Sequence, residues 1–97
     1  MRLHNKEKLD LFKRKHPTLV SAVNRWVTIV EAADWKNPSD VKRTFGVNVD
    51  FVGKQVVFDV GGNKARVVAK VVYGILQIVN VTDVLDHKEY DKGKWKE

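Results

Sequence analysis

The sequence contains no cysteine, two prolines and no long apolar run. Without cysteine the chain has no disulfides, thiolate nucleophiles or zinc sites with sulfur ligands, which is typical of a reducing compartment. No stretch approaches the ~18 apolar residues of a spanning helix, and the charged first sixteen residues lack the apolar region of a secretory signal. We therefore expect a cytoplasmic protein that does not associate with membranes.

Motifs for metals and nucleotides are also missing. We find no His/Cys/Asp/Glu cluster at metal-ligand spacing, no Walker loop and no nucleophile elbow. The segment Gly61-Gly62-Asn63 is too short for a dinucleotide fingerprint and favours a hairpin turn with positive φ. We expect neither a metal nor a cofactor.

Length and charge limit the number of domains and the kinds of partner that the chain can bind. With 97 residues the chain is expected to form one domain, residues 1–97, around one core. Its net charge of +6 favours polyanionic partners, because positive potential raises the local concentration of phosphate groups. Nucleic acid and an acidic protein partner both fit, and charge alone does not choose between them.

The first half of the chain has helical periodicity. Residues 5–16 carry a sparse apolar stripe, and residues 18–33 repeat apolar residues every three or four positions, with Trp26 on the core side. Asn37, followed by proline, predicts the N-cap of a short helix over 38–44.

The second half has a period of two, which predicts strands. The runs, separated by glycine-containing turns, are 49–52, 55–60, 64–73 and 76–81. Helices followed by strands predict an α+β fold, with N-terminal helices packed on one face of a C-terminal antiparallel sheet and the other face open to solvent or ligand. We expect the polar tail 92–97 around Trp95 to be frayed, or ordered only by a partner.

Two segments carry groups suited to chemistry on phosphates. In the strand 64–73, alternation places Lys64, Arg66 and Lys70 on the open face, which is either a solvated face or an anion-binding row. After the last strand, His87 and Tyr90 would share one face of a helical turn. Histidine exchanges protons near neutral pH, and tyrosine does so only if its pKa is lowered, so this segment is either an acid/base site or a frayed charged turn.

Taken together, Gly-Gly-Asn-x-x-Arg at 61–66 and His-x-x-Tyr-Asp at 87–91, with the fragments 33–36, 38–42 and 50–53, resemble the HigB-type toxins of the RelE superfamily. The resemblance implies a microbial-RNase-like fold and a ribosome-dependent mRNA interferase, an endoribonuclease of a toxin-antitoxin system. It also implies a helix-turn-helix antitoxin of the HigA type, bound in a higher-order hetero-oligomer. The toxin alone is not expected to bind DNA.

The resemblance places Arg66 and the 87–92 turn at the active site. We expect the RNA 2′-hydroxyl to attack its phosphate without a metal, with Arg66 on the phosphate oxygens. His87 and Tyr90 are candidates for proton transfer in either order, Asp91 for orientation, and Lys92 for stabilising charge or lowering the tyrosine pKa. The residues expected to hold RNA are Lys64, Lys70 and, on the first helix, Lys6, Lys8, Lys13, Arg14 and Lys15.

This sequence departs from the family pattern at three positions. Asp86 stands where the family usually has threonine, Ala65 where an aromatic is frequent, and Asp59 where asparagine is common. Asp86 could orient His87 and raise its pKa, or repel the phosphate. The alternative to an enzyme is therefore a non-catalytic RNA- or ribosome-binding module of the same fold.

Overall fold

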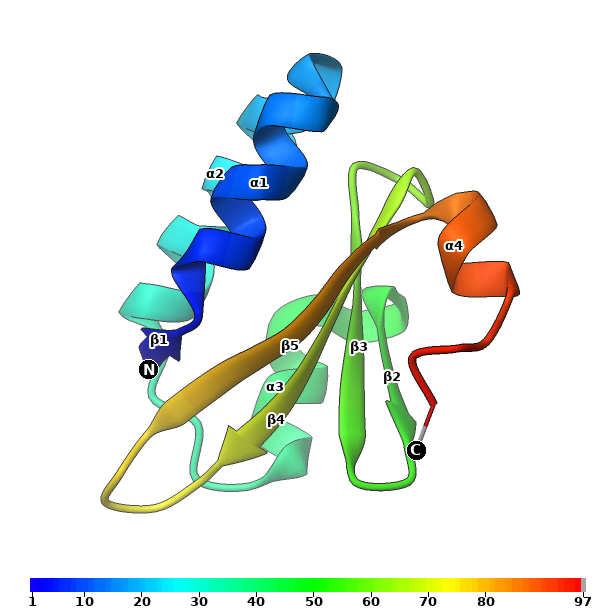
Figure 1. Cartoon of the computed structure of the whole chain (residues 1–97). Coiled ribbons are helices and arrows are strands. Elements are labelled where there is room, and N and C mark those ends of the chain that lie inside the picture. The colour runs from blue at the N-terminus through cyan, green and yellow to red at the C-terminus, as the bar shows by residue number, and fades with distance from the viewer. Residues whose placement is uncertain (97) are drawn as a thin grey trace.

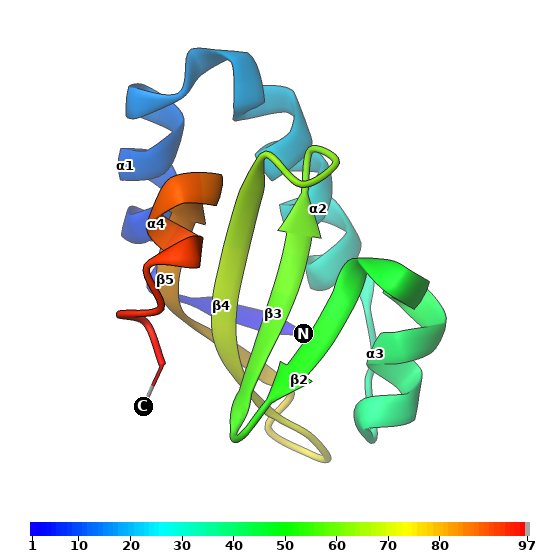
Figure 2. The same cartoon turned by 90° about the vertical axis from the view of Figure 1, so that its right-hand side faces the viewer.

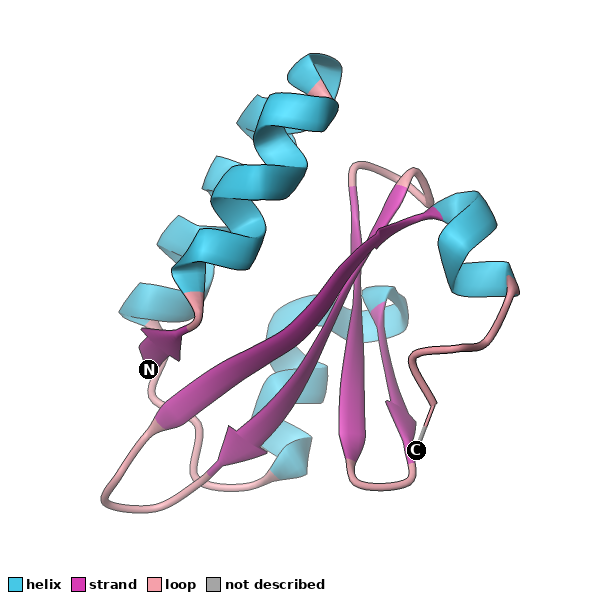
Figure 3. Ribbon diagram, viewed as in Figure 1, coloured by secondary structure: helices cyan, strands magenta, loops and turns pink. Residues whose placement is uncertain are grey.

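The computed structural model describes residues 1–96 and contains a mixed sheet with helices on both sides (Figures 1 and 3). The helices are α1 (Lys6–Lys15), α2 (Val20–Ala32), α3 (Pro38–Phe45) and α4 (His87–Asp91), with short 3-10 turns at Pro17–Leu19 and Gly46–Asn48. The strands are β1 (Arg2–His4), β2 (Val49–Val52), β3 (Gln55–Val60), β4 (Ala65–Val72) and β5 (Ile78–Asp86).

The sheet has the order β1-β5-β4-β3-β2. All neighbouring pairs are antiparallel except β1, which runs parallel to β5. The sequence analysis missed β1, because three residues without clear alternation do not show a strand pattern. The α+β class is confirmed, and the purely antiparallel, purely C-terminal sheet is corrected by this N-terminal edge strand.

One face of the sheet carries the main core, as predicted. Trp26 of α2 packs edge-on against Phe58 of β3, with ring centroids 5.3 Å apart, and Trp35 stacks on the same phenylalanine. Ala65 and Val67 of β4 belong to this core and are fully buried. The prediction that Trp26 and the apolar side of β4 form the core is confirmed.

The predicted helix boundaries need little change. Residues 18–33 divide into the 3-10 turn after Pro17 and helix α2. The Asn37 side chain caps α3 by accepting a hydrogen bond from the Asp40 backbone N–H, as its place before proline predicted. Gly46 ends α3 with a φ of 59°, in the region where glycine carries no steric penalty.

The last strand, β5, continues past the predicted end at residue 81 to Asp86, and it contains an irregularity in its pairing with β4. Opposite Val68 and Ala69 of β4 the register of β5 shifts, so that Asp83 and Val81 are the partners and Thr82 is left out of the pairing. The Thr82 hydroxyl instead donates to the Val68 carbonyl at 3.1 Å. The extra residue reverses the alternation of inward and outward side chains along β5. The sequence pattern therefore did not show that the strand continues to Asp86.

The opposite face of the sheet is not open. Helix α4 and the following tail lie on it, across the sheet from α1 and α2 (Figures 1 and 2). Trp95 is only 6% exposed and packs with Val57 and Val68 in a second, smaller core. The expectation that this face is open is therefore wrong. The expectation of a frayed tail is also wrong for residues 92–96, and Glu97 lies outside the described residues.

Within residues 1–96, no helix has the length and apolar character needed to span a membrane.

Candidate functional site

Arg66 lies at the start of β4, on the sheet face that carries α4, and it is buried. Its side chain is 10% exposed, and its Nε lies 2.9 Å from Oδ1 of Asp59, the residue directly opposite it on β3. Nη1 donates to the Ala65 carbonyl at 3.2 Å, and Nη2 donates to the Asn63 side-chain oxygen at 3.1 Å. The ion pair and the two hydrogen bonds together hold the guanidinium in one orientation.

The hairpin between β3 and β4 supplies one of these partners. Gly61, Gly62 and Asn63 all have positive φ, between 59° and 72°, which confirms the predicted turn. A Cβ on Gly61 would come within 3.1 Å of the Leu19 side chain, so the turn also needs glycine for close packing. The turn directs Asn63 back toward Arg66.

The Tyr90 ring covers the guanidinium of Arg66. The Cζ of Arg66 lies 5.0 Å from the Tyr90 ring centroid, in the geometry of a cation–π contact. On α4, burial raises the pKa of the Tyr90 phenol; the Arg66 charge lowers this pKa, and nearby Asp50, Asp59 and Asp91 raise it. The net direction is upward, opposite to the lowering of the tyrosine pKa that was one of the two roles expected of Lys92.

His87 and Asp91 form an exposed pair on the outer side of α4. The Nε2 of His87 lies 3.1 Å from Oδ2 of Asp91, one helical turn later. Their side chains are 61% and 60% exposed, so both are accessible to a large substrate. Lys92 ends α4 and is also exposed. The predicted helical turn is present, and it brings His87 and Asp91 together.

Asp86 has a structural role, and the spacing Asp86-x-x-Glu89 was the sequence signal for it. Its carboxylate accepts a hydrogen bond from the Glu89 backbone N–H at 2.8 Å, and the Glu89 carboxylate accepts one from the Asp86 backbone N–H at 3.1 Å. This reciprocal capping box starts α4. Threonine, the residue expected here from the resemblance, is also an N-cap former, so aspartate at this position keeps the local structure.

The other predicted cations do not form one row. Lys64 lies in the hairpin before β4 and is exposed, and Lys70 is half-buried near the far end of the strand. An open hollow beside the hairpin and the start of α4 brings Lys64 together with Asn63, His87 and Lys88. Arg66 does not line this hollow. The prediction that Lys64, Arg66 and Lys70 form an exposed row of cations is therefore wrong, because Arg66 is buried.

The five basic residues of α1 also differ from one another. Lys6 pairs with Glu31 at 2.7 Å, and Lys13 contacts Asp10 at 3.4 Å. Lys8 donates to the Thr82 carbonyl at 2.9 Å. Arg14 and Lys15 are exposed and have no side-chain partner among the described residues, so they are the cations of α1 best placed to meet a polyanion.

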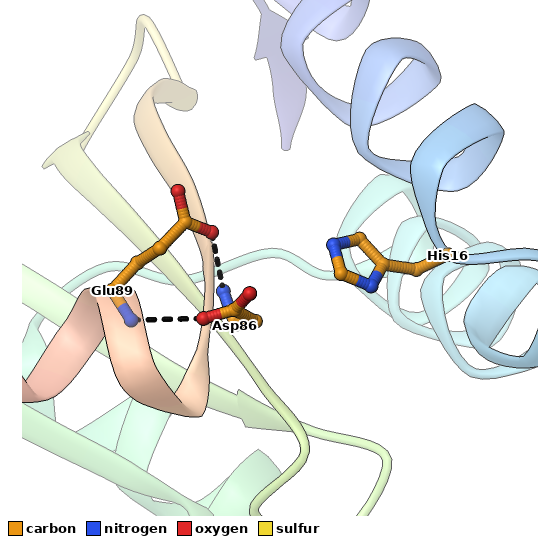
Figure 4. Close-up of side chains that lie close together, drawn as sticks. All are labelled: His16, Asp86 and Glu89. Atoms are coloured by element: carbon orange, nitrogen blue, oxygen red, sulfur yellow. Dashed lines mark hydrogen bonds between the residues drawn. The ribbon is translucent and has the colours of Figure 1, made fainter.

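One group of possible metal ligands appears in the described part of the chain. His16, Asp86 and Glu89 place one ligand atom each within 4.8 Å of one another (Figure 4). Sequence spacing could not reveal this group, because it joins the end of α1 to the start of α4. Both carboxylates already accept backbone hydrogen bonds in the capping box.

Sequence reasoning missed two residues that complete the site. Asp59 was noticed only as a departure from the family pattern, although pairing β3 with β4 places it opposite Arg66. Trp95 was placed in a frayed tail, but its ring stacks on Tyr90, with centroids 4.9 Å apart and an interplanar angle of 13°. A large aromatic residue in a polar tail was the available signal.

Comparison with known proteins shows which family the chain resembles. The sequence model of the HigB toxin family, described as the RelE-like toxic component of a toxin-antitoxin system, matches residues 20–93. The mRNA interferase HigB of Escherichia coli O6:H1 is 28% identical over 94 residues, covering 95% of this chain and 90% of the relative. The mRNA interferase HigB of Shigella flexneri is 41% identical over 59 residues, covering 59% of this chain and 56% of that protein.

The family match extends over α2, α3, the four longest strands and α4, and so includes Arg66, His87 and Tyr90. The chain therefore belongs to the HigB family of RelE-like toxins, the toxic components of toxin-antitoxin systems.

Proposed function

We propose that this toxin is an mRNA endoribonuclease that uses the RNA 2′-hydroxyl as the nucleophile and needs no metal ion. The observation that supports this most directly is the exposed pair of His87 and Asp91 beside a protonated Tyr90 on Arg66. This set combines a proton acceptor, a proton donor and a fixed cation. The relatives named mRNA interferase identify messenger RNA as the substrate class.

In this proposal His87 is the general base. The Nε2 of His87 lies 3.1 Å from Oδ2 of Asp91, and in this proposal the carboxylate favours the neutral tautomer with its proton on Nε2, which leaves Nδ1 as the proton acceptor. Nδ1 takes the proton of the 2′-hydroxyl while the 2′-oxygen forms a bond to phosphorus. The P–O5′ bond breaks, and the products are a 2′,3′-cyclic phosphate and a 5′-hydroxyl.

Tyr90 is the proton donor in the same step. The phenol is protonated at neutral pH, so it is available to donate its proton to a phosphate oxygen or to the leaving 5′-oxygen as charge develops there. Arg66 contacts this ring, and its charge favours the dianionic phosphate of the transition state. Exposed Lys64 and Lys92 are placed to hold neighbouring phosphates.

The cellular setting of the proposal follows from the substrate. We propose that cleavage occurs on the ribosome in the cytoplasm, where the exposed Arg14 and Lys15 of α1 contact ribosomal RNA. Lys6, Lys8 and Lys13 of the same helix would add to this contact. Lys70 would extend the RNA-binding surface along β4. A helix-turn-helix antitoxin of the HigA type would hold the toxin inactive in a hetero-oligomeric complex.

Growth arrest tests this function. Expression of the wild-type chain in bacteria should stop growth, and His87→Ala should remove the effect. His4→Ala is the matched control, because His4 is also exposed and lies in β1. Equal arrest by all three proteins would contradict the proposed role of His87, provided that the variants accumulate to equal soluble levels.

One observation favours the second candidate, a non-catalytic RNA-binding module: only 10% of the Arg66 side chain is exposed. Such a module would arrest translation without producing cut messages. Mapping of mRNA 5′ ends after induction distinguishes the two, because an enzyme creates new ends that are absent with His87→Ala and a binder creates none.

A further inference from the structure

We propose that Trp95 is a positioning residue of the active site, holding Tyr90 on Arg66 from the tail that follows α4. The inference rests on the proposed role of Tyr90 in RNA cleavage. Trp95 lies beyond residue 93, where the family match ends, so this feature is not part of what the family model describes.

The contacts of Trp95 explain how a tail residue is held in the site. Its indole N–H donates to the Tyr90 backbone carbonyl at 2.9 Å, while its ring stacks on the Tyr90 ring. The Trp95 carbonyl accepts a hydrogen bond of 3.2 Å from Gln55, a polar side chain that is itself 5% exposed. Trp95 is therefore tied to Tyr90 at one end and to β3 at the other.

The contacts that Tyr90 makes with both residues give Trp95 a functional meaning. The Tyr90 ring stacks on Trp95 and also contacts the Arg66 guanidinium, so Trp95 supports the ring that covers Arg66. The underside of Trp95 rests on Val57 and Val68, which are at most 1% exposed and so provide a rigid base. Helix α4 has five residues, too few for independent stability, so its aromatic side chain needs an external support.

Without Trp95, the Tyr90 ring would lose one of its two stacking partners and gain access to water. The phenol would then sample several rotamers, and only some of them cover Arg66. A misplacement of this kind lowers the rate of the chemical step and leaves RNA binding largely intact. Greater access to water would also return the Tyr90 pKa toward its ordinary value.

Two variants of the full chain separate positioning from simple packing. Trp95→Leu keeps an apolar cover on Val57 and Val68 and removes the stack and the N–H donor. Trp95→Phe restores a stacking ring. Lys94→Ala, an exposed change in the same tail, is the control. All should be compared at a temperature at which circular dichroism shows every variant folded.

The activity assay measures cleavage of mRNA on ribosomes. For Trp95→Leu we expect kcat to fall on the order of tenfold with KM changed by less than about twofold, and Trp95→Phe to recover most of kcat. Lys94→Ala should match wild type. A Trp95→Leu protein that is less stable but has wild-type kcat would overturn the proposal, as would a loss expressed only in KM.

A second readout does not depend on catalysis. The chain has two tyrosines, so in a Tyr73→Phe background the alkaline absorbance titration reports Tyr90 alone. We expect Trp95→Leu to lower the midpoint of this titration and Trp95→Phe to leave it near the value of the background. An unchanged midpoint in Trp95→Leu would overturn the positioning role even if the wild-type chain cleaved no RNA, whereas absent cleavage with a shifted midpoint would contradict only the proposed function.

Discussion

The pairing of Arg66 with Asp59 predicts a measurable stability difference. Asp59→Ala removes the carboxylate that lies 2.9 Å from Nε and leaves a cation whose side chain is 10% exposed. Removing one member of a fully buried pair costs ~3–5 kcal/mol. Asp59 is 25% exposed, and Arg66 keeps two hydrogen bonds and the Tyr90 ring, so we expect about 2 kcal/mol here. Asp59→Asn keeps an acceptor and should cost about 1 kcal/mol or less.

Urea unfolding measures this difference. For a chain of this size the urea dependence is ~1.3 kcal/mol per molar, so Asp59→Ala should lower the midpoint by roughly 1.5 M. A double-mutant cycle with Arg66→Met isolates the pairwise part and should give a coupling of ~2 kcal/mol. The exposed pair of Lys6 and Glu31, with side chains 51% and 45% exposed, is the control and should couple by less than ~1 kcal/mol. A coupling below ~0.5 kcal/mol between Asp59 and Arg66 would refute the reasoning, because that is the value expected of independent sites.

The remaining predictions concern the cap, metals, pH and the antitoxin. Asp86→Ala should cost ~1 kcal/mol and reduce activity by loosening α4, whereas Asp86→Thr should keep the capping hydrogen bond and restore both; urea unfolding and cleavage assays check this. EDTA should not abolish cleavage of isolated RNA by the folded protein. Loss of this cleavage in EDTA would contradict the metal-free mechanism. Burial raises the pKa of Tyr73 and Tyr90 above 10.0, so the unfolded chain loses these protons first, and unfolding free energy should fall as pH rises above 10.0. If α1 is the antitoxin contact, reversing Lys13, Arg14 and Lys15 to glutamate should slow association and flatten its salt dependence; an unchanged on-rate would exclude this contact.

The sequence was most informative where local rules decide the structure. The cap at Asn37, the positive φ values from Gly61 to Asn63 and the apolar side of β4 each depend on a few neighbouring residues, and each prediction is confirmed. The resemblance to HigB-type toxins depended on the order and spacing of short motifs, and the match over 20–93 confirms it.

The missed features depend on contacts between distant segments. Strand β1 exists because it pairs with β5, more than seventy residues later, and the tail is ordered because Trp95 reaches Val57 and Val68. The burial of Arg66 has the same origin, since alternation assigns a side chain to a face but does not reveal what later covers that face. The catalytic roles of Arg66, His87, Tyr90, Asp91 and Lys92 stay predictions.

The central claim is that this toxin cleaves mRNA through the 2′-hydroxyl, with His87 as the base. The most direct test gives the purified protein ribosomes carrying an mRNA with a single 2′-deoxy substitution at the mapped cleavage site. We expect cleavage at this position to disappear, the unmodified message to yield a 2′,3′-cyclic phosphate and a 5′-hydroxyl, and His87→Ala to yield neither. Cleavage of the 2′-deoxy message at an undiminished rate would contradict the account, because attack by water would then have replaced attack by the 2′-oxygen.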